Sequence, residues 1–195
     1  MRKQLARMLL LGAIMTPRLL AQAVPAGTSE MGRHRDVAAT FDVMRSNVTS
    51  SPNFLMEGGS LQVHQQLYGR IGVVGDLAYI HTTNEVSSGV GLDLVTATIG
   101  PRYTCPIANQ RIFVFGQALV GDAFGFNSVF PKPSGAVSST NSLATQVGGG
   151  ISFALSPLLA VRAIQADWVH TLFPNATTSV QNNLRVGAGI VFRFH

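Results

Sequence analysis

The residues of this sequence that could do chemistry are carboxylates, arginines and glutamines spaced at alternate positions within apolar stretches. Successive side chains of a β-strand point to opposite faces, so residues at alternate positions share one face of a sheet. On such a face, opposite charges can pair, and the arginine fork bonds carboxylates at several points. We therefore expect an inner polar network made of Asp42, Asp76, Arg102, Gln117, Gln146, Arg162, Gln165, Asp167, Arg185 and Arg193.

Two details of this network depend on how the strands are built. Arg162 and Asp167 lie five positions apart, which strict alternation would place on opposite faces. A β-bulge near residues 163–164 would turn both of them, with Gln165, to the same side. Asp167 and Arg185 should also pair, because their strands meet around the connection formed by residues 172–181.

Nothing in the sequence indicates a catalytic, cofactor or metal site. His64, His81 and His170 could act as bases, but no His-x-Ser pair or acidic partner lies near them in sequence, and His64 should face inward among glutamines. No His, Cys and Asp cluster has the spacing of metal ligands. The glycines at 148–150 lack the lysine of a phosphate-binding loop. Cys105 is the only cysteine, so it cannot form an internal disulfide.

The composition limits the class of protein. The chain has 195 residues, of which 12% are charged and 46% hydrophobic. No stretch reaches the roughly 18 apolar residues that a membrane helix needs. The net charge of +5 comes mostly from residues 1–23, which hold four basic residues and no acid. The remainder is close to neutral, so the high pI does not indicate binding to nucleic acid.

The first 23 residues are typical of a secretory signal peptide. They combine a basic start, an apolar run at residues 8–15 and the small-x-small sequence Ala21-Gln22-Ala23. A buried N-terminal helix is the alternative, but the run is short and uniform rather than amphipathic. Residues 24–35 are small and polar without periodicity, and we expect a flexible segment there.

The rest of the chain alternates between apolar and polar faces in eight segments of roughly 9–13 residues, a length that suits a tilted strand crossing a membrane. We expect strands at residues 36–44, 60–68, 71–81, 92–103, 111–123, 142–154, 158–170 and 182–194. The connections alternate long and short, and the longest irregular one spans residues 125–141.

This rhythm favours a membrane barrel over a soluble one. Outer-membrane barrels have short turns at one end and long loops at the other, whereas a lipocalin-type barrel would carry charge on its outer face. We therefore expect residues 36–195 to form an all-β, eight-stranded, antiparallel up-and-down transmembrane β-barrel. Eight strands leave a lumen that side chains fill. A plugged lumen is expected, and a narrow ion or water path along its charges is the alternative.

Aromatic residues should mark the two rims of the barrel, because amphipathic rings favour the membrane interface. Five lie near the short connections, namely Tyr68, Tyr103, Phe113, Phe192 and Phe194. The opposite rim should carry Tyr79 and Trp168.

Several short motifs, taken in order, resemble small bacterial outer-membrane β-barrel proteins of the superfamily of the outer-membrane protein A transmembrane domain. They are F-D-V at 41–43, I-G-P-R-Y at 99–103, F-G-Q-A-L at 115–119, V-R-A-I-Q-A-D-W at 161–168 and Q-N-N-L-R-V at 181–186. The resemblance covers residues 36–195, and the terminal F-R-F-H resembles the strand that the barrel-assembly machinery reads. No room remains after His195 for the peptidoglycan-binding domain of larger members.

The resemblance implies an integral outer-membrane protein, a monomer that contacts lipid and the assembly machinery and binds no nucleic acid. We expect a non-enzymatic role in envelope structure or in interactions of the outer loops, whose partner the sequence does not identify. A narrow pore is the alternative, and a lipid A-modifying enzyme comes third.

Overall fold

The computed structural model of the chain describes residues 34–46, 54–83, 91–130, 135–174 and 179–194. The expected signal peptide, residues 1–23, lies outside the described residues, as do residues 24–33 and His195. Arg35, which the sequence assigned to the flexible segment, is already the first residue of a strand.

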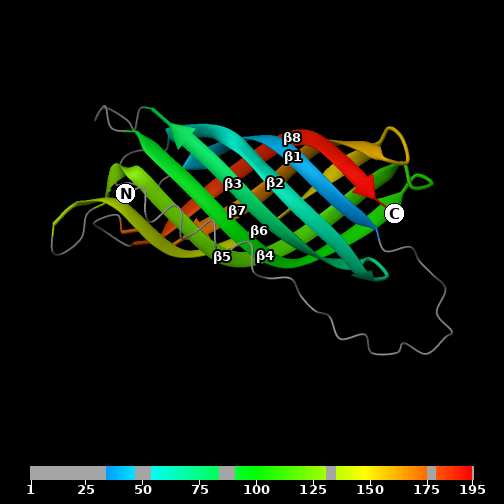
Figure 1. Cartoon of the computed structure of the whole chain (residues 1–195), viewed down its shortest axis with the longest axis horizontal. Helices are drawn as coiled ribbons and strands as arrows, with labels where there is room; N and C mark the ends of the chain where they lie inside the picture. Colours follow the sequence, from blue (N-terminus) through cyan, green and yellow to red (C-terminus); the bar gives the residue numbers. More distant parts are fainter. Residues whose placement is uncertain (1–33, 47–53, 84–90, 131–134, 175–178, 195) are drawn as a thin grey trace. The chain divides into compact units, whose positions relative to one another are not determined.

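Eight strands form a closed barrel in which each strand pairs with its neighbours in the chain and β1 pairs with β8 (Figure 1). Every pairing is antiparallel. The predicted fold class is therefore confirmed. The strands are β1 (Arg35–Ser46), β2 (Phe54–Tyr68), β3 (Ile71–Thr82), β4 (Leu92–Ile107), β5 (Ile112–Phe130), β6 (Val137–Ala154), β7 (Leu159–Thr171) and β8 (Gln181–Phe194).

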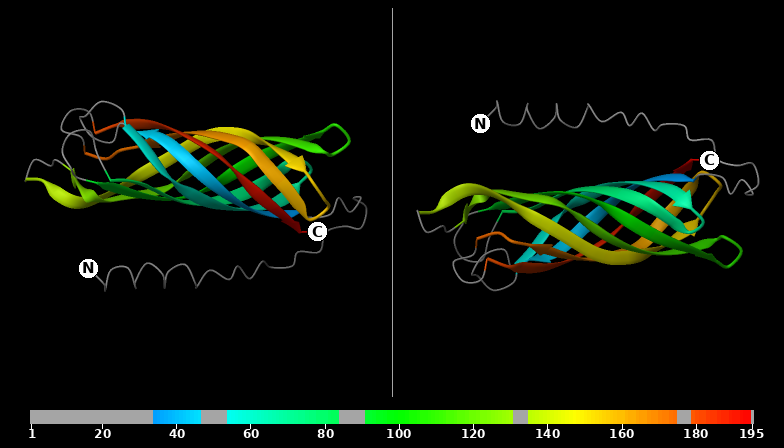
Figure 2. Two further views of the ribbon diagram at one scale, coloured as in Figure 1. Left: turned by 90° about the horizontal axis from the view of Figure 1, so that it is seen from above. Right: turned by 90° about the horizontal axis from the view of Figure 1, so that it is seen from below.

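The two ends of the barrel differ. The turns after β2, β4 and β6 lie at one end, here called the short-turn end, where β1 also begins and β8 finishes (Figures 1 and 2). The turn between β2 and β3 has two residues, and Gly69 adopts a φ of 56° there, which glycine tolerates without strain. The other connections lie at the opposite end, here called the long-loop end.

Several strands are longer than the sequence indicated. The β5–β6 hairpin continues through most of residues 125–141, so the expectation of a long irregular segment there is wrong. This hairpin reaches furthest at the long-loop end (Figures 1 and 2). Its serines and threonines hide the apolar alternation but still pair through their backbones, as Phe126 does with Ser139. Likewise β2 begins at Phe54 instead of Ser60, because Gly58 and Gly59 interrupt the pattern but not the pairing with β1.

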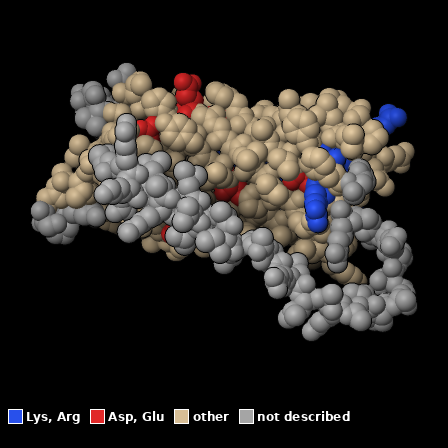
Figure 3. All heavy atoms as spheres, in the orientation of Figure 1, with Lys and Arg blue, Asp and Glu red and all other residues tan. Residues whose placement is uncertain are grey.

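The outer face of the barrel carries an uncharged belt. On β1, Arg35 and Arg45 are the first and last outward residues, and those between them are Val37, Ala39, Phe41 and Val43. Glu57 and Asp122 also face outward, on the halves of their strands nearer the long-loop end. Most of the face shown in Figure 3 is likewise uncharged.

Large apolar side chains fill this belt on all sides, including Leu61, Leu77, Ile99, Val147 and Ile190, each about half exposed or more.

No helix among the described residues is long and apolar enough to cross a membrane.

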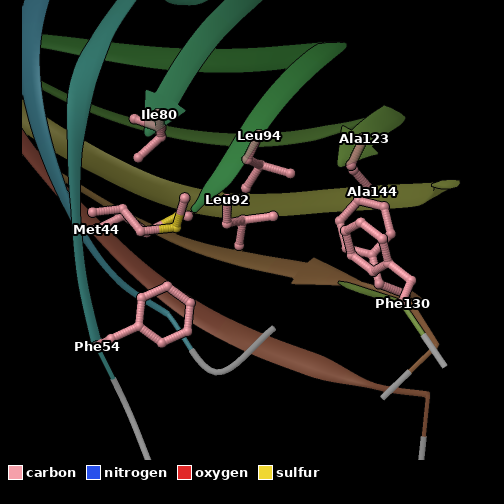
Figure 4. Packing of buried hydrophobic residues seen from close by; sticks show 10 residues of the cluster. Met44, Phe54, Ile80, Leu92, Leu94, Ala123, Phe130 and Ala144 are labelled. Atoms are coloured by element: carbon pink, nitrogen blue, oxygen red, sulfur yellow. The ribbon is translucent and has the colours of Figure 1, made fainter. Parts of the chain in front are cut away.

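Much of the interior at the long-loop end is apolar, which the sequence did not lead us to expect. Figure 4 shows these side chains pointing into the barrel from several strands. We call the cluster the apolar plug; it consists of Met44, Phe54, Met56, Ile80, Leu92, Leu94, Ala123, Phe130, Ala144 and Phe173. The rings of Phe130 and Phe173 lie 5.7 Å apart between their centroids. This packing closes one end of the lumen within the described residues.

Candidate functional site

The candidate site is the polar interior between the apolar plug and the short-turn end. Of the ten residues expected there, nine are buried and face inward, and Arg193 is partly exposed near the end of β8. They do not all meet. Asp42 accepts a hydrogen bond from Thr40 at 2.9 Å, and Gln146 accepts one from Thr98 at 3.5 Å. These two bonds are separate from those that link the other residues.

The centre of the network is Arg185 on β8, which contacts two carboxylates. Its guanidinium donates to both oxygens of Asp76, at 3.2 and 2.9 Å, and to Asp167 Oδ2 at 3.2 Å. The expected contact between Asp167 and Arg185 is present, and these two residues are directly opposite each other in the β7–β8 register. Asp76 was not expected as a partner, because it comes from β3 across the lumen.

Glutamines connect this centre to the neighbouring strands. Gln117 donates to Asp167 Oδ1 at 3.0 Å, and Gln165 donates to Asp167 Oδ2 at 2.5 Å. Gln62 donates to Asp76 Oδ2 at 2.6 Å. The sequence placed Gln62 on the inner face but not in the network. Gln62 lies opposite Asp76 in the β2–β3 register, which would have identified it as a member of the network. The sequence alone does not give that register, because it depends on how the strands pair.

The expected β-bulge on β7 is confirmed. The β7–β8 register shifts between Arg162 and Gln165, and the residues between them, Ala163 and Ile164, both lie on the outer surface. As a result Arg162, Gln165 and Asp167 are all buried. A single extra residue thus brings three polar side chains into the lumen from one strand.

Two glycines make room for carboxylates. A Cβ on Gly148 would lie 2.3 Å from Ala166 O and 2.6 Å from Asp167 Cα, and one on Gly187 would lie 1.9 Å from Asp42 Oδ1. Gly148 lies on β6, between Gln117 on β5 and Asp167 on β7. Its missing side chain therefore lets these two groups bond across the intervening strand.

A pair of arginines lies nearer the short-turn end than Arg185. Arg102 and Arg162 both donate to Gln62 Oε1, at 2.5 and 2.6 Å. Their guanidinium carbons lie 4.4 and 4.6 Å from the centroid of the Phe115 ring. Arg102 also bonds Gln117, and Arg162 also bonds Gln165.

An open cavity of about 500 Å³, here called the vestibule, leads to these arginines from the short-turn end. Its lining includes Asp36, His64, Arg70, Phe113 and Arg193.

The histidines have partners that the sequence did not reveal. His64 is buried and its Nδ1 lies 3.2 Å from Asp36 Oδ2, and His81 Nδ1 lies 3.3 Å from Asp93 Oδ1. Neither carboxylate lies near its histidine in sequence, because each comes from the neighbouring strand. Among the described residues, no three His, Cys, Asp or Glu side chains gather closely enough to hold a metal ion.

The aromatic residues divide by face. Tyr68, Tyr103, Phe192 and Phe194 are exposed near the short-turn end, and Tyr79 and Trp168 are exposed on the other halves of their strands. Phe113 does not join them. It lies two and four positions before Phe115 and Gln117, so it is on the same inward face of β5. The guanidinium carbon of Arg193 lies 4.3 Å from the centroid of its ring. Its assignment to the outer girdle is therefore wrong.

A closed eight-stranded antiparallel barrel with an apolar outside and a charged inside defines the class, the small outer-membrane β-barrel. The fold that the resemblance implied, a closed eight-stranded barrel, is therefore confirmed. The sequence itself matches no known family and no curated protein.

Similar solved structures include Ail, the attachment invasion locus protein of Yersinia pestis, in complex with the heparin analogue sucrose octasulfate. It has 16% identity and a TM-score of 0.57, and the match covers 84% of this chain and 100% of Ail. Neisserial surface protein A has 12% identity and a TM-score of 0.66, with 82% of this chain and 97% of that chain covered. At such identities the likeness shows the fold alone.

Proposed function

We propose that this chain is an integral outer-membrane barrel with a closed lumen, which supports the envelope or presents its long-loop end outside the cell. One observation carries the proposal: beyond the vestibule the interior is filled, first by the Arg185 network and then by the apolar plug. Side chains that pack and bond to one another in this way favour a structural role over transport.

The proposal includes the orientation of the barrel in the membrane. Barrels of this class keep their short turns in the periplasm and their longer loops outside. The extended β5–β6 hairpin would then project from the cell surface, as a place for contacts with an external partner. The uncharged belt would contact lipid, and the assembly machinery would insert the chain as a monomer.

A narrow pore is the second candidate, and the vestibule favours it. This cavity is open at the short-turn end and reaches inward as far as Arg102 and Arg162. It would be half of a path, which rearrangement of the apolar plug could complete. A lipid-modifying activity receives less support, because His81 and Asp93 contact Tyr79 and Asn127 and no serine joins their described hydrogen bonds.

Planar-bilayer conductance with purified, refolded protein separates the two candidates. The closed barrel should give no current steps of uniform size. A variant that shortens the plug, with Met44, Leu94 and Phe130 all changed to alanine, serves as the comparison and should conduct more. Current steps of uniform size from the unaltered protein, occurring more often as more protein is added to the bilayer, would overturn the closed lumen in favour of the pore.

A further inference from the structure

The vestibule ends at two arginines that share one neutral acceptor. Arg102 on β4 and Arg162 on β7 are both almost fully buried, and each donates to Gln62 Oε1. Since those bonds are 2.5 and 2.6 Å long, the two donor nitrogens lie no more than about 5 Å apart. Like charges at this separation repel unless an anion compensates them.

The described carboxylates act on these two arginines only from a distance. The acceptors of Arg102 and Arg162 are the amide oxygens of Gln62, Gln117 and Gln165. Neither arginine has a carboxylate within ion-pair distance among the described residues, whereas Arg185 has two. Asp76 and Asp167 are thus already bonded to a different cation, Arg185.

The vestibule itself is cationic. Among the described residues, its lining includes four arginines, Arg70, Arg102, Arg162 and Arg193, and a single carboxylate, Asp36. That carboxylate lies 3.2 Å from His64 and 3.8 Å from Arg193. The Nε of Arg162 is buried and has no hydrogen-bond partner in the part of the chain that the structure describes. The cavity of about 500 Å³ has space for an ion of several atoms together with water.

We propose that the inner end of the vestibule binds a small oxyanion, a phosphate, sulfate or carboxylate, between Arg102 and Arg162. The guanidinium fork matches the geometry of such oxygens, and the Phe115 ring beneath both arginines holds the forks in place. Because the site lies inside the ring of strands, the anion enters from the aqueous side of the short-turn end. This property is independent of whether the lumen conducts.

Inorganic phosphate is the probe, titrated at constant ionic strength against chloride into ¹⁵N-labelled full chain folded in a detergent without phosphate. The Nε–Hε signals of Arg102 and Arg162 should shift in a saturable way, while that of Arg45, which lies outside at the other end, should not. Arg162→Gln should weaken binding by about tenfold or more, since a charged hydrogen bond is lost. Arg45→Gln is the matched control and should bind as before.

A second variant decides the matter should Arg162→Gln fail to fold. Ser152 lines the vestibule directly opposite Arg162 in the β6–β7 register. Ser152→Asp should place a carboxylate against Arg162, raise the midpoint of unfolding and abolish the phosphate shift. Undiminished phosphate binding in Ser152→Asp would overturn the proposal, as would equal shifts of all arginine signals.

A parallel titration with a soluble short-chain phosphatidic acid identifies the source of the anion. Shifts with inorganic phosphate support a free ion. Shifts with the lipid alone assign the same arginines to a headgroup, and no shift with either probe refutes the site.

Discussion

Buried charges in this lumen are stabilised in two different ways. Arg185 is neutralised by Asp76 and Asp167, whereas Arg102 and Arg162 are held by amide oxygens and the Phe115 ring. A buried ion is costly unless it is paired and hydrogen-bonded. The two groups should therefore respond differently to substitution.

Substitution of Asp167 and Arg185 should be non-additive. Asp167→Asn removes one of the two carboxylates that pair with Arg185, and Arg185→Gln leaves both carboxylates without their cation. Each should lower the free energy of unfolding by roughly 3–5 kcal/mol. The double variant should lose less than the sum, as shown by urea unfolding in lipid vesicles. Asp122→Asn, on the outer face, is the control and should add independently to Arg185→Gln. Additive losses for Asp167 and Arg185 would refute their coupling.

Gly148 should tolerate no side chain. In Gly148→Ala the new methyl group would meet the backbone of Ala166 and Asp167 at 2.3 and 2.6 Å, so β6 and β7 must move apart. We expect a loss of roughly 1–3 kcal/mol in the free energy of unfolding. Gly75→Ala is the matched control, because nothing lies within 4 Å of a Cβ there. Equal stability of the two variants would contradict the close packing.

At the scale of the strands, hydrophobic alternation predicted most of the structure, because the outer face of each strand is mostly apolar and the inner face is mostly polar. It placed all eight strands, and the five-residue spacing of Arg162 and Asp167 predicted the bulge. It failed where neither face is apolar. Ser139 and Thr140 lie in a strand although both look like loop residues.

The sequence also did not predict which side chains contact each other across neighbouring strands. His64 meets Asp36, and Gln62 meets Asp76, through a register that no single strand encodes. The side to which Phe113 points was missed for a related reason. Phe113 and Val114 are both apolar, so the sequence near the start of β5 does not distinguish its two faces.

Position along β8 should determine the cost of an added charge on the outer face. Ala188 lies near the middle of the outward row, and Ala188→Arg should cost roughly 2–4 kcal/mol, as expected at a membrane midplane. Asn182→Arg, near the long-loop end of the same row, should cost far less. Unfolding titrations of the two variants in vesicles measure the difference. Equal costs would argue that this face does not meet lipid.

At the scale of the whole molecule, the proposed orientation can be tested with single cysteines. In a Cys105→Ser background, Ser139→Cys places a thiol at the long-loop end and Pro157→Cys places one at the short-turn end; both positions are exposed. A membrane-impermeant maleimide applied to intact cells should label only Ser139→Cys. After lysis it should label both. Preferential labelling of Pro157→Cys in intact cells would reverse the orientation.

The contact between Arg185 and Asp76 joins residues 109 positions apart, on the last strand and the third. Arg185 therefore cannot reach Asp76 until β8 has paired with β1 and the cylinder is complete. During assembly, Arg185 arrives paired with Asp167 on β7 alone, and the vacant side of the sheet presents Asp76 without a cation. Closing the seam and pairing Asp76 with Arg185 are one event. The β1–β8 junction, although held by the same backbone pairing as the others, should consequently be the last to form and should not fray.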